Sequence, residues 1–442
     1  MVVPDKIKGS MMPLDRNAFR QSVPVLAAKV DPVRAGALLS SQAMRRTLLD
    51  LRRVKSVLPT EDGKRLVMLR LTDEVDLSPE ARKFLQEQYA ELVTHVIELD
   101  YDYWTVDDIL AAVLPEELVE GAPSGFAAIG HIAHLNLNAE YLPYKYLIGQ
   151  VILDKNEGRI KTVVNKTDNI SNKFRVFKME LLAGEPNYVV EHHESNCKFT
   201  FDFSEVYWNS RLHTEHTRLV SLFKPEDLVA DVFAGVGPFA LPAAKKGCAV
   251  FANDLNPKSY QYLSKNVEDN KISDLVRASC EDGRDFIRAV FERALDNPIP
   301  PPKTSKAQAK RGRKIDAEAP TTSTPLPRPP PLRRRVTQFS MNLPDTAIEF
   351  LDAFRGVLSG ARERELSGVY EGALPMVHCY CFTRELEPEA AERDIRQRVE
   401  ARLGHPLESE VSVHWVRSVA PNKEMYCISF RLPSDVAFER NQ

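Results

Sequence analysis

The second half of the chain alternates apolar strand patterns with helical patterns, and this alternation limits the possible folds more than any other feature. From about residue 204 onward, strand patterns end near Asp231, Asp254, Asp282 and Asn342, and a helical pattern follows each one. Strands separated by helices imply a parallel sheet with helices on both faces. Two closing strand patterns joined by Ala-Pro-Asn-Lys indicate an antiparallel hairpin at the edge. We therefore predict a doubly wound α/β domain over residues 204–442.

Two smaller regions precede this domain. Residues 1–103 contain a strand at 64–72, a helix at 78–93 and a returning strand, which indicates an α/β unit whose start we expect to be disordered. Residues 104–203 open with a short helix at 106–115 and then carry short β patterns, so we predict a small β-rich domain. The expected strands of this domain are 125–137, 149–155, 160–168, 174–184, 187–195 and 197–203.

A proline-rich and basic stretch interrupts the predicted sheet from about residue 296 to 335. Residues 298–335 hold ten of the chain's thirty prolines and ten Lys or Arg residues, with few large apolar side chains. Such a composition cannot bury enough apolar surface to offset the entropy of ordering. We predict a disordered insertion, which acts either as a solvated loop or as a basic tether that adds non-specific RNA affinity.

The overall composition excludes several classes of protein. A chain of 442 residues with a net charge of -3 has room for two or three domains, and any nucleic-acid contact must use a local basic surface. Apolar runs are shorter than the roughly 18 residues that a membrane span requires, and no secretory signal is recognisable. The six cysteines show no CxxC pair, and no cluster has metal-ligand spacing. We expect an intracellular protein without a bound metal.

The segment from Asp231 to Phe239 carries the sharpest chemical signal. A strand that ends in an acid and is followed by Gly235-Val-Gly237 brings a backbone turn close to a cofactor at the carboxyl end of the sheet. The dinucleotide pattern needs a third glycine where Ala240 stands, so the segment departs from the pyrophosphate-binding fingerprint. A cofactor without phosphates, such as S-adenosylmethionine, fits better.

Polar side chains also follow the next three strands. Asp254, with Leu255 after it, lies where a carboxylate can accept the ribose hydroxyl protons, and Asp282-Gly283 could flank the adenine. Asn342-Leu-Pro at the fourth strand could present an amide to a planar acceptor. Each acid alone could be a helix N-cap, and Asn342-Leu-Pro could be a plain strand-to-helix turn. Three acids at successive strand ends together with Gly-x-Gly favour the cofactor site.

These motifs in this order resemble the archaeal and eukaryotic tRNA (guanine-N1)-methyltransferase family. The resemblance covers roughly residues 125–432 apart from the insertion, and it is carried by residues 206–218, 231–240, 253–257 and 342–344. It implies a Rossmann-like class I methyltransferase domain that uses S-adenosylmethionine, preceded by RNA-binding domains of which the first contacts the outer corner of tRNA. It further implies methylation of N1 of guanosine 37, 3′ to the anticodon, which supports reading-frame maintenance. A monomer found in cytoplasm, nucleus and mitochondrial matrix is implied as well.

The chemistry of guanine N1 defines what the active site must supply. N1 carries a proton, so methyl transfer needs a base for that proton and positive charge near O6. By the resemblance, Glu215 is the base, Arg175 stabilises charge on O6, and Tyr207 positions the extruded guanine. His216 is expected against the cofactor, and Asn342 is expected to touch both cofactor and guanine.

Plainer interpretations of these residues remain open at this point. Glu215 could form an exposed i, i+4 ion pair with Arg211, while Arg175 could point to solvent, Tyr207 could belong to the core and His216 could lie on the surface. Two other functions also stay open, namely another S-adenosylmethionine-dependent methyltransferase and a catalytically silent RNA-binding protein. The absence of a Pro-Cys nucleophile beside a strand argues against cytosine C5 chemistry. The sequence leaves open which tRNAs are substrates and whether inosine is methylated.

Overall fold

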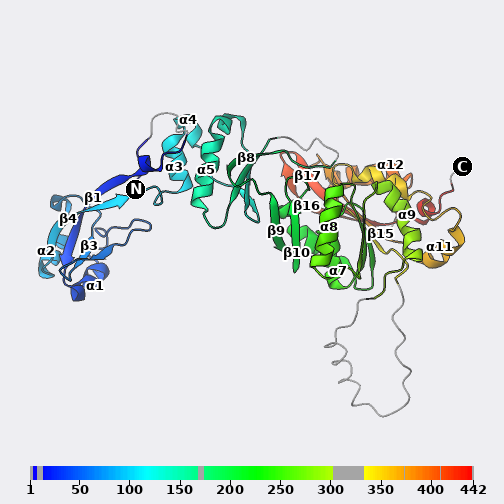
Figure 1. Ribbon diagram of the computed structural model, residues 1–442, viewed down its shortest axis with the longest axis horizontal. Helices are drawn as coiled ribbons and strands as arrows, with labels where there is room; N and C mark the ends of the chain where they lie inside the picture. Colours follow the sequence, from blue (N-terminus) through cyan, green and yellow to red (C-terminus); the bar gives the residue numbers. More distant parts are fainter. Residues whose placement is uncertain are drawn as a thin grey trace, which may run out of the picture. The chain divides into compact units, whose positions relative to one another are not determined.

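The computed structural model describes residues 3–6, 13–167, 174–301, 333–372, 374–408 and 410–440 (Figure 1). The chain forms two compact units, the first made of Met1–Lys166 with Glu180–Pro186 and the second of Thr167–Met179 with Asn187–Gln442. The chain therefore passes between the units three times. The division into parts at residues 103 and 203 that the sequence suggests stays a prediction.

Unit 1 begins with a four-stranded antiparallel sheet in the order β2-β3-β1-β4. Its elements are β1 (Gln21–Val30), α1 (Pro32–Ser40), β2 (Val57–Pro59), β3 (Arg65–Met68), α2 (Pro79–Glu87) and β4 (Glu91–Leu99). The sequence predicted neither β1 nor α1, although β1 is a central strand. Ser78 caps α2 as expected, but the helix is shorter than predicted because Tyr89 takes a φ of 53° and ends it before β4 begins.

The rest of unit 1 combines a second sheet with helices. The sheet has the order β5-β6-β7-β8, with β5 (Ala127–Ile129), β6 (Ile132–Leu135), β7 (Thr162–Lys166) and β8 (Met179–Gly184), and the helices are α3 (Val106–Val113), α4 (Glu116–Val119) and α5 (Lys145–Lys155). The strand predicted at 149–155 is wrong, because these residues lie in α5. Leu147, Ile148, Val151 and Ile152 are buried at helical spacing, so this apolar run forms the buried face of a helix.

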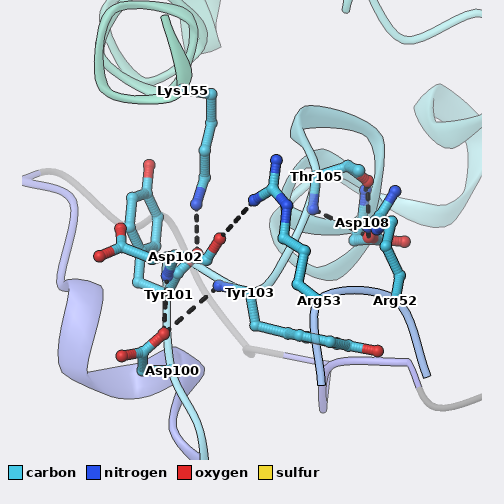
Figure 2. Close-up of polar contacts among 9 residues, drawn as sticks. All are labelled: Arg52, Arg53, Asp100, Tyr101, Asp102, Tyr103, Thr105, Asp108 and Lys155. Atoms are coloured by element: carbon cyan, nitrogen blue, oxygen red, sulfur yellow. Dashed lines mark hydrogen bonds and ion pairs between the residues drawn. The ribbon is translucent and has the colours of Figure 1, made fainter. Parts of the chain in front are cut away.

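Polar groups join the end of β4 to α3 and α5 (Figure 2). The Thr105 hydroxyl accepts from the Asp108 backbone N–H at 3.1 Å, and the Asp108 carboxylate accepts from the Thr105 N–H at 2.9 Å, which forms a capping box. Lys155, in the last turn of α5, donates to the Tyr101 carbonyl. The apolar core is continuous across this junction and includes Leu99, Trp104, Ile109 and Ile148.

Unit 2 is built on a seven-stranded sheet in the order β13-β12-β11-β14-β15-β17-β16. The strands are β11 (Leu228–Asp231), β12 (Ala249–Asn253), β13 (Val276–Ser279), β14 (Gln338–Met341), β15 (Met376–Thr383), β16 (Ser412–Ala420) and β17 (Lys423–Arg431). The strands from β13 to β15 pair in parallel, and the β16–β17 hairpin is antiparallel. This arrangement confirms the predicted α/β fold class.

Helices and one hairpin complete unit 2 (Figure 1). The helices are α6 (His213–Leu222), α7 (Ala240–Lys246), α8 (Pro257–Asp269), α9 (Gly283–Asp296), α11 (Glu363–Tyr370), α12 (Pro388–Leu403) and α13 (Ser434–Ala437). Short 3-10 turns occupy Ser210–Leu212 and Ala347–Phe354 in this unit, and Arg16–Phe19, Glu74–Asp76 and Ala139–Tyr144 in unit 1. The hairpin of β9 (Val189–Glu194) and β10 (Cys197–Asp202) packs on α8, where Asn266 and Asn270 accept from its backbone N–H groups.

The predicted insertion falls mainly on residues 302–332, which lie outside the described residues. At its ends, Ile299 pairs with Arg333 in an antiparallel bridge, so the two chain ends of the insertion meet at the domain. Over the described ranges, the chain contains no helix that is both long and apolar enough to cross a bilayer.

Candidate active site

The glycine turn after β11 is tied to the end of the neighbouring strand. Gly235 has a φ of 55° and Gly237 a φ of 101°, both in the left-handed region that favours glycine. A Cβ on Gly237 would lie 2.1 Å from Leu241 Cδ1. The Gly235 N–H donates to Asp254 Oδ2 at 2.8 Å. The turn and the Asp254 carboxylate therefore form one rigid corner at the carboxyl end of the sheet.

Asn253, to which the sequence analysis gave no role, joins three strand ends. Its Nδ2 donates to the Val232 carbonyl at 3.2 Å and to the Glu281 carbonyl at 3.1 Å. Its Oδ1 accepts from the Ser279 hydroxyl at 3.0 Å and from the Glu281 N–H at 3.1 Å. A buried amide that uses both ends in this way fixes the ends of β11, β12 and β13 relative to one another.

Asp254 and Asp282 have different local roles. Asp254 Oδ1 accepts from the Asn256 N–H at 2.9 Å, but Asn256 itself caps α8, so Asp254 is not the helix cap. Asp282 is the N-cap of α9 and accepts from the N–H two residues later at 2.9 Å. The plainer interpretation therefore holds locally for Asp282, while Asp254 remains turned toward the glycine corner.

The residues around Asp282 form an apolar wall. Gly283 is buried, and a Cβ there would lie 2.9 Å from the Phe233 ring. Phe233 packs edge-to-face on Phe350 with ring centroids 5.0 Å apart. Leu255 is half-buried, with its carbonyl 3.8 Å from Cys280 Sγ. An apolar wall of aromatic rings beside a capping carboxylate suits a planar heterocycle with an exocyclic amine.

Three acceptor side chains at the ends of β11 and β14 have buried oxygens without a hydrogen-bond partner among the described residues. These are both carboxylate oxygens of Asp231, Ser340 Oγ and Asn342 Oδ1. Burial, together with the charge of Asp254, raises the pKa of Asp231 to about 8. Buried acceptors without donors are costly, so they suit a ligand that brings cationic and donor groups. A sulfonium cofactor with an ammonium group fits this set, whereas a phosphate would be repelled.

Glu215 is buried on α6 and held by two donors. Its side chain is 5% exposed in the folded chain, and Arg218 donates to it through Nε at 2.7 Å and Nη2 at 2.6 Å. The Tyr380 hydroxyl donates to Glu215 Oε1 at 2.7 Å. His414 Nε2 lies 3.6 Å from Glu215 Oε2. The ion-pair partner is thus Arg218 and not Arg211, and the exposed-pair interpretation of Glu215 is wrong.

Arg175 contacts the segment that follows β14, and Tyr207 lies near Arg175. Arg175 Nη2 donates to Asp345 Oδ2 at 2.9 Å, directly after the Asn-Leu-Pro turn. Its φ of 57° places a non-glycine residue in the left-handed region, which marks a constrained position. Tyr207 is 37% exposed, and its ring stacks on Phe177 with centroids 6.4 Å apart. Neither side chain is a plain core or solvent-facing residue.

His216 lies behind the glycine turn. Its Nδ1 is 2.7 Å from Glu194 Oε1, and its ring meets Phe239 edge-to-face at 4.8 Å. Phe239 also packs against Tyr380 with centroids 5.8 Å apart. Because Phe239 belongs to the glycine turn, it connects that turn to Glu215 through Tyr380.

Sequence reasoning missed Arg218, Tyr380, His414 and Asp345. The Arg218 pair could have been predicted, since Arg218 stands three residues after Glu215 on a predicted helix and belongs to the motif at residues 206–218. Tyr380 and His414 come from β15 and β16, and only the sheet order brings these strands to α6. The sequence spacing between Glu215 and Tyr380 or His414 gives no indication that these side chains meet.

Comparisons with known proteins then identify the family. A model described as "TYW2 N-terminal domain" matches residues 106–187, and one described as "TRM5/TYW2 methyltransferase domain" matches residues 190–300. The tRNA (guanine(37)-N(1))-methyltransferase of Coprinopsis cinerea is 57% identical over 445 residues, which cover 98% of this chain and 97% of the relative. The chain belongs to this family. The tRNA (guanine(37)-N(1))-methyltransferase of Schizosaccharomyces pombe is 46% identical, with 99% and 98% covered.

Solved structures agree with the fold of this methyltransferase. Trm5b from Pyrococcus abyssi is 22% identical with a TM-score of 0.56, and the match covers 92% of this chain and 99% of that one. A structure described as the complex of aTrm5 and tRNALeu is 19% identical with a TM-score of 0.60, covering 92% and 100%. The predictions of the family, of a Rossmann-like class I fold and of an S-adenosylmethionine-dependent methyltransferase are confirmed.

Proposed function

We propose that this methyltransferase transfers the methyl group of S-adenosylmethionine to N1 of guanosine 37 in tRNA, with the Glu215 carboxylate accepting the N1 proton. The observation that carries the proposal is a buried carboxylate connected through Tyr380 and Phe239 to the glycine turn. Near-full-length relatives at 41% to 57% identity share the named activity, which supports the nucleobase and position.

The cofactor pocket is proposed at the carboxyl ends of β11 to β14. Asp231, Asp254 and Asn342 supply acceptors, and the Gly235 turn leaves room for close approach of the backbone. When bound, the cofactor supplies a methyl group activated on a cationic sulfur. The low local dielectric strengthens the attraction between this cation and the Asp231 carboxylate.

Glu215 retains one acceptor direction for the proton. An ionised carboxylate has about four lone-pair positions, and three of them accept from Arg218 and Tyr380. Oε1 has both of its positions filled, whereas Oε2 accepts a hydrogen bond only from the Arg218 Nε–H among the described residues. We therefore assign proton acceptance to Oε2.

Arg175 and Tyr207 are proposed to hold the guanine. A guanidinium has five N–H donors, and the bond to Asp345 uses one, so others can reach O6 as it gains negative charge. Tyr207, backed by Phe177, offers a partly exposed ring on which an extruded base can stack. Both residues belong to unit 2, as does Glu215.

Glu215→Gln tests the proposed base. We expect turnover to fall by roughly two to four decades, while cofactor affinity stays within a small factor, because the variant loses the proton acceptor and the charge opposite Arg218 but keeps the cofactor pocket. Glu439→Gln is a matched control, since Glu439 follows α13 in the same unit and forms a bidentate pair with Arg355. Methyl transfer is measured with unmodified tRNA and with tRNA in which adenosine replaces guanosine 37. Equal loss of cofactor binding in Glu215→Gln, or methylation of the adenosine tRNA, would contradict the proposal.

The remaining expectations concern the tRNA and the cell. We propose that residues 1–103 contact the outer corner of tRNA and that the protein acts as a monomer, free of membranes, in cytoplasm, nucleus and mitochondrial matrix. The resemblance to the family supports these statements. Light scattering tests the monomer, and fractionation with compartment markers tests the distribution.

A further inference from the structure

We infer that Tyr380 and Arg218 are positioning residues that hold the Glu215 carboxylate in one orientation and leave an acceptor position on its Oε2. The inference rests on the proposed role of Glu215 as the base. Both residues act through Glu215, and neither is proposed to touch the guanine.

The geometry fixes the carboxylate in two directions. Arg218 binds both oxygens from the same helix, which sets the plane of the carboxylate. Tyr380 binds Oε1 from β15, which sets the rotation about the side chain. The Tyr380 ring is fully buried and packs on Phe239, so the hydroxyl that it presents has little freedom to move.

The same contacts affect proton affinity. Hydrogen bonds donated to a carboxylate favour its charged form. Protonation of Glu215 would leave the partly buried Arg218 without its counter-charge and would weaken the bond from Tyr380. Loss of either donor therefore makes the carboxylate easier to protonate than it is in the wild-type enzyme.

The other titratable groups around Glu215 stay neutral near pH 7 to 8. Burial raises the pKa of Tyr380 far above its ordinary value and that of Cys427 to about 12. Burial, with the nearby Arg218 charge, lowers the pKa of His414 below its ordinary value. On the Arg218 side, burial lowers the pKa of His378 to about 3. A difference between the pH–rate profiles of a Tyr380 variant and the wild type is thus assignable to the Glu215–Arg218 pair.

Tyr380→Phe is the decisive variant, because it removes only the hydroxyl and retains the ring against Phe239. The single-turnover rate is measured from pH 5.5 to 9 with saturating cofactor and tRNA. We expect the midpoint of the acid limb to move up by about one to two pH units, since a hydrogen bond to a charged group is lost. Tyr370→Phe is the matched control, because its buried hydroxyl accepts from the Val336 N–H in the same unit, away from Glu215.

A second readout separates this inference from the proposed function. Infrared titration of the free enzyme follows protonation of the Glu215 carboxyl, with Glu215→Gln used to assign the band. Tyr380→Phe is expected to raise the pH at which that band appears, whatever the catalytic role of Glu215. An unmoved band, a rate lowered equally at every pH, or the same shift in Tyr370→Phe would overturn the inference. If Glu215→Gln keeps normal activity while the band still moves in Tyr380→Phe, the role of Glu215 as the base is refuted. The positioning role of Tyr380 and Arg218 would then still stand.

Discussion

Asp231 provides the sharpest test of the cofactor pocket, because its carboxylate is fully buried and lacks a partner among the described residues. Burial and the neighbouring Asp254 charge raise its pKa from 3.8 to about 8. At pH 7, only about one molecule in ten then carries the charge that a cationic cofactor needs. We expect cofactor affinity to rise about tenfold from pH 6 to pH 7 and to level off above pH 8.

The same shift predicts a stability effect of opposite sign. An acid whose folded pKa is raised is protonated in the fold and ionised in the unfolded chain between about pH 4 and pH 8, so the free energy of unfolding falls as pH rises through this window. The rise of the Asp231 pKa from 3.8 to about 8 costs about 1.4 kcal/mol for each pH unit. The free energy of unfolding is therefore lowered by on the order of 5 kcal/mol at pH 8. Asp231→Asn is therefore expected to make the free enzyme more stable at pH 8 and yet to weaken cofactor binding.

Calorimetry decides between these outcomes. Binding is measured at pH 6, 7, 8 and 9 in two buffers of different ionisation enthalpy, which counts the protons released on binding. Wild type should release close to one proton at pH 7, and Asp231→Asn should lose most of the pH slope. Asp269→Asn is the control, since its exposed carboxylate pairs with Lys265 within α8 and is not among the proposed cofactor residues. A flat wild-type profile, or the same slope in Asp231→Asn, would refute the reasoning.

Two further changes test the turn and the insertion. Gly237→Ala should destabilise the fold by about 1 to 3 kcal/mol and impair cofactor binding, because the new Cβ meets Leu241 at a positive φ. Gly235→Ala, where the space is open, should cost about 1 kcal/mol, and equal melting temperatures for the two variants would contradict this ranking. Replacing residues 302–332 by a short Gly-Ser linker should leave the melting temperature unchanged, since Ile299 and Arg333 already meet. A large drop would contradict the composition-based prediction of disorder.

The sheet of unit 2 could be predicted from the sequence because each of its strands is a short apolar run followed by a helix signal. Polar residues at the ends of β11, β12 and β13 have to meet once the strands are parallel, so Asp231, Asp254 and Asp282 were accessible to prediction. Unit 1 was less accessible. β1 carries a proline and mixed polarity, and α5 carries the β-branched residues typical of strands.

The surroundings of the base could not be predicted for a different reason. Glu215 and Tyr380 are 165 positions apart, and their contact depends on β15 lying inside the sheet. An aromatic residue in a buried strand is indistinguishable in sequence from any other core residue. Burial also decides which groups keep their charge, as the contrast between Asp231 and the exposed acids shows, and burial is a property of the assembled fold.

The route of the chain between the two units limits how this enzyme can be divided. Arg175 and Phe177 precede β8, yet they belong to unit 2, because the segment Thr167–Met179 joins that unit while the strands before and after it stay in unit 1. A fragment that starts at Asn187 would retain the sheet, the glycine turn and Glu215, but it would lack the arginine proposed for O6. A chimera of two relatives that are joined at residue 187 is therefore expected to fold and to bind the cofactor, but to transfer methyl groups slowly. A functional chimera has to take residues 167–179 from the same relative as the catalytic sheet.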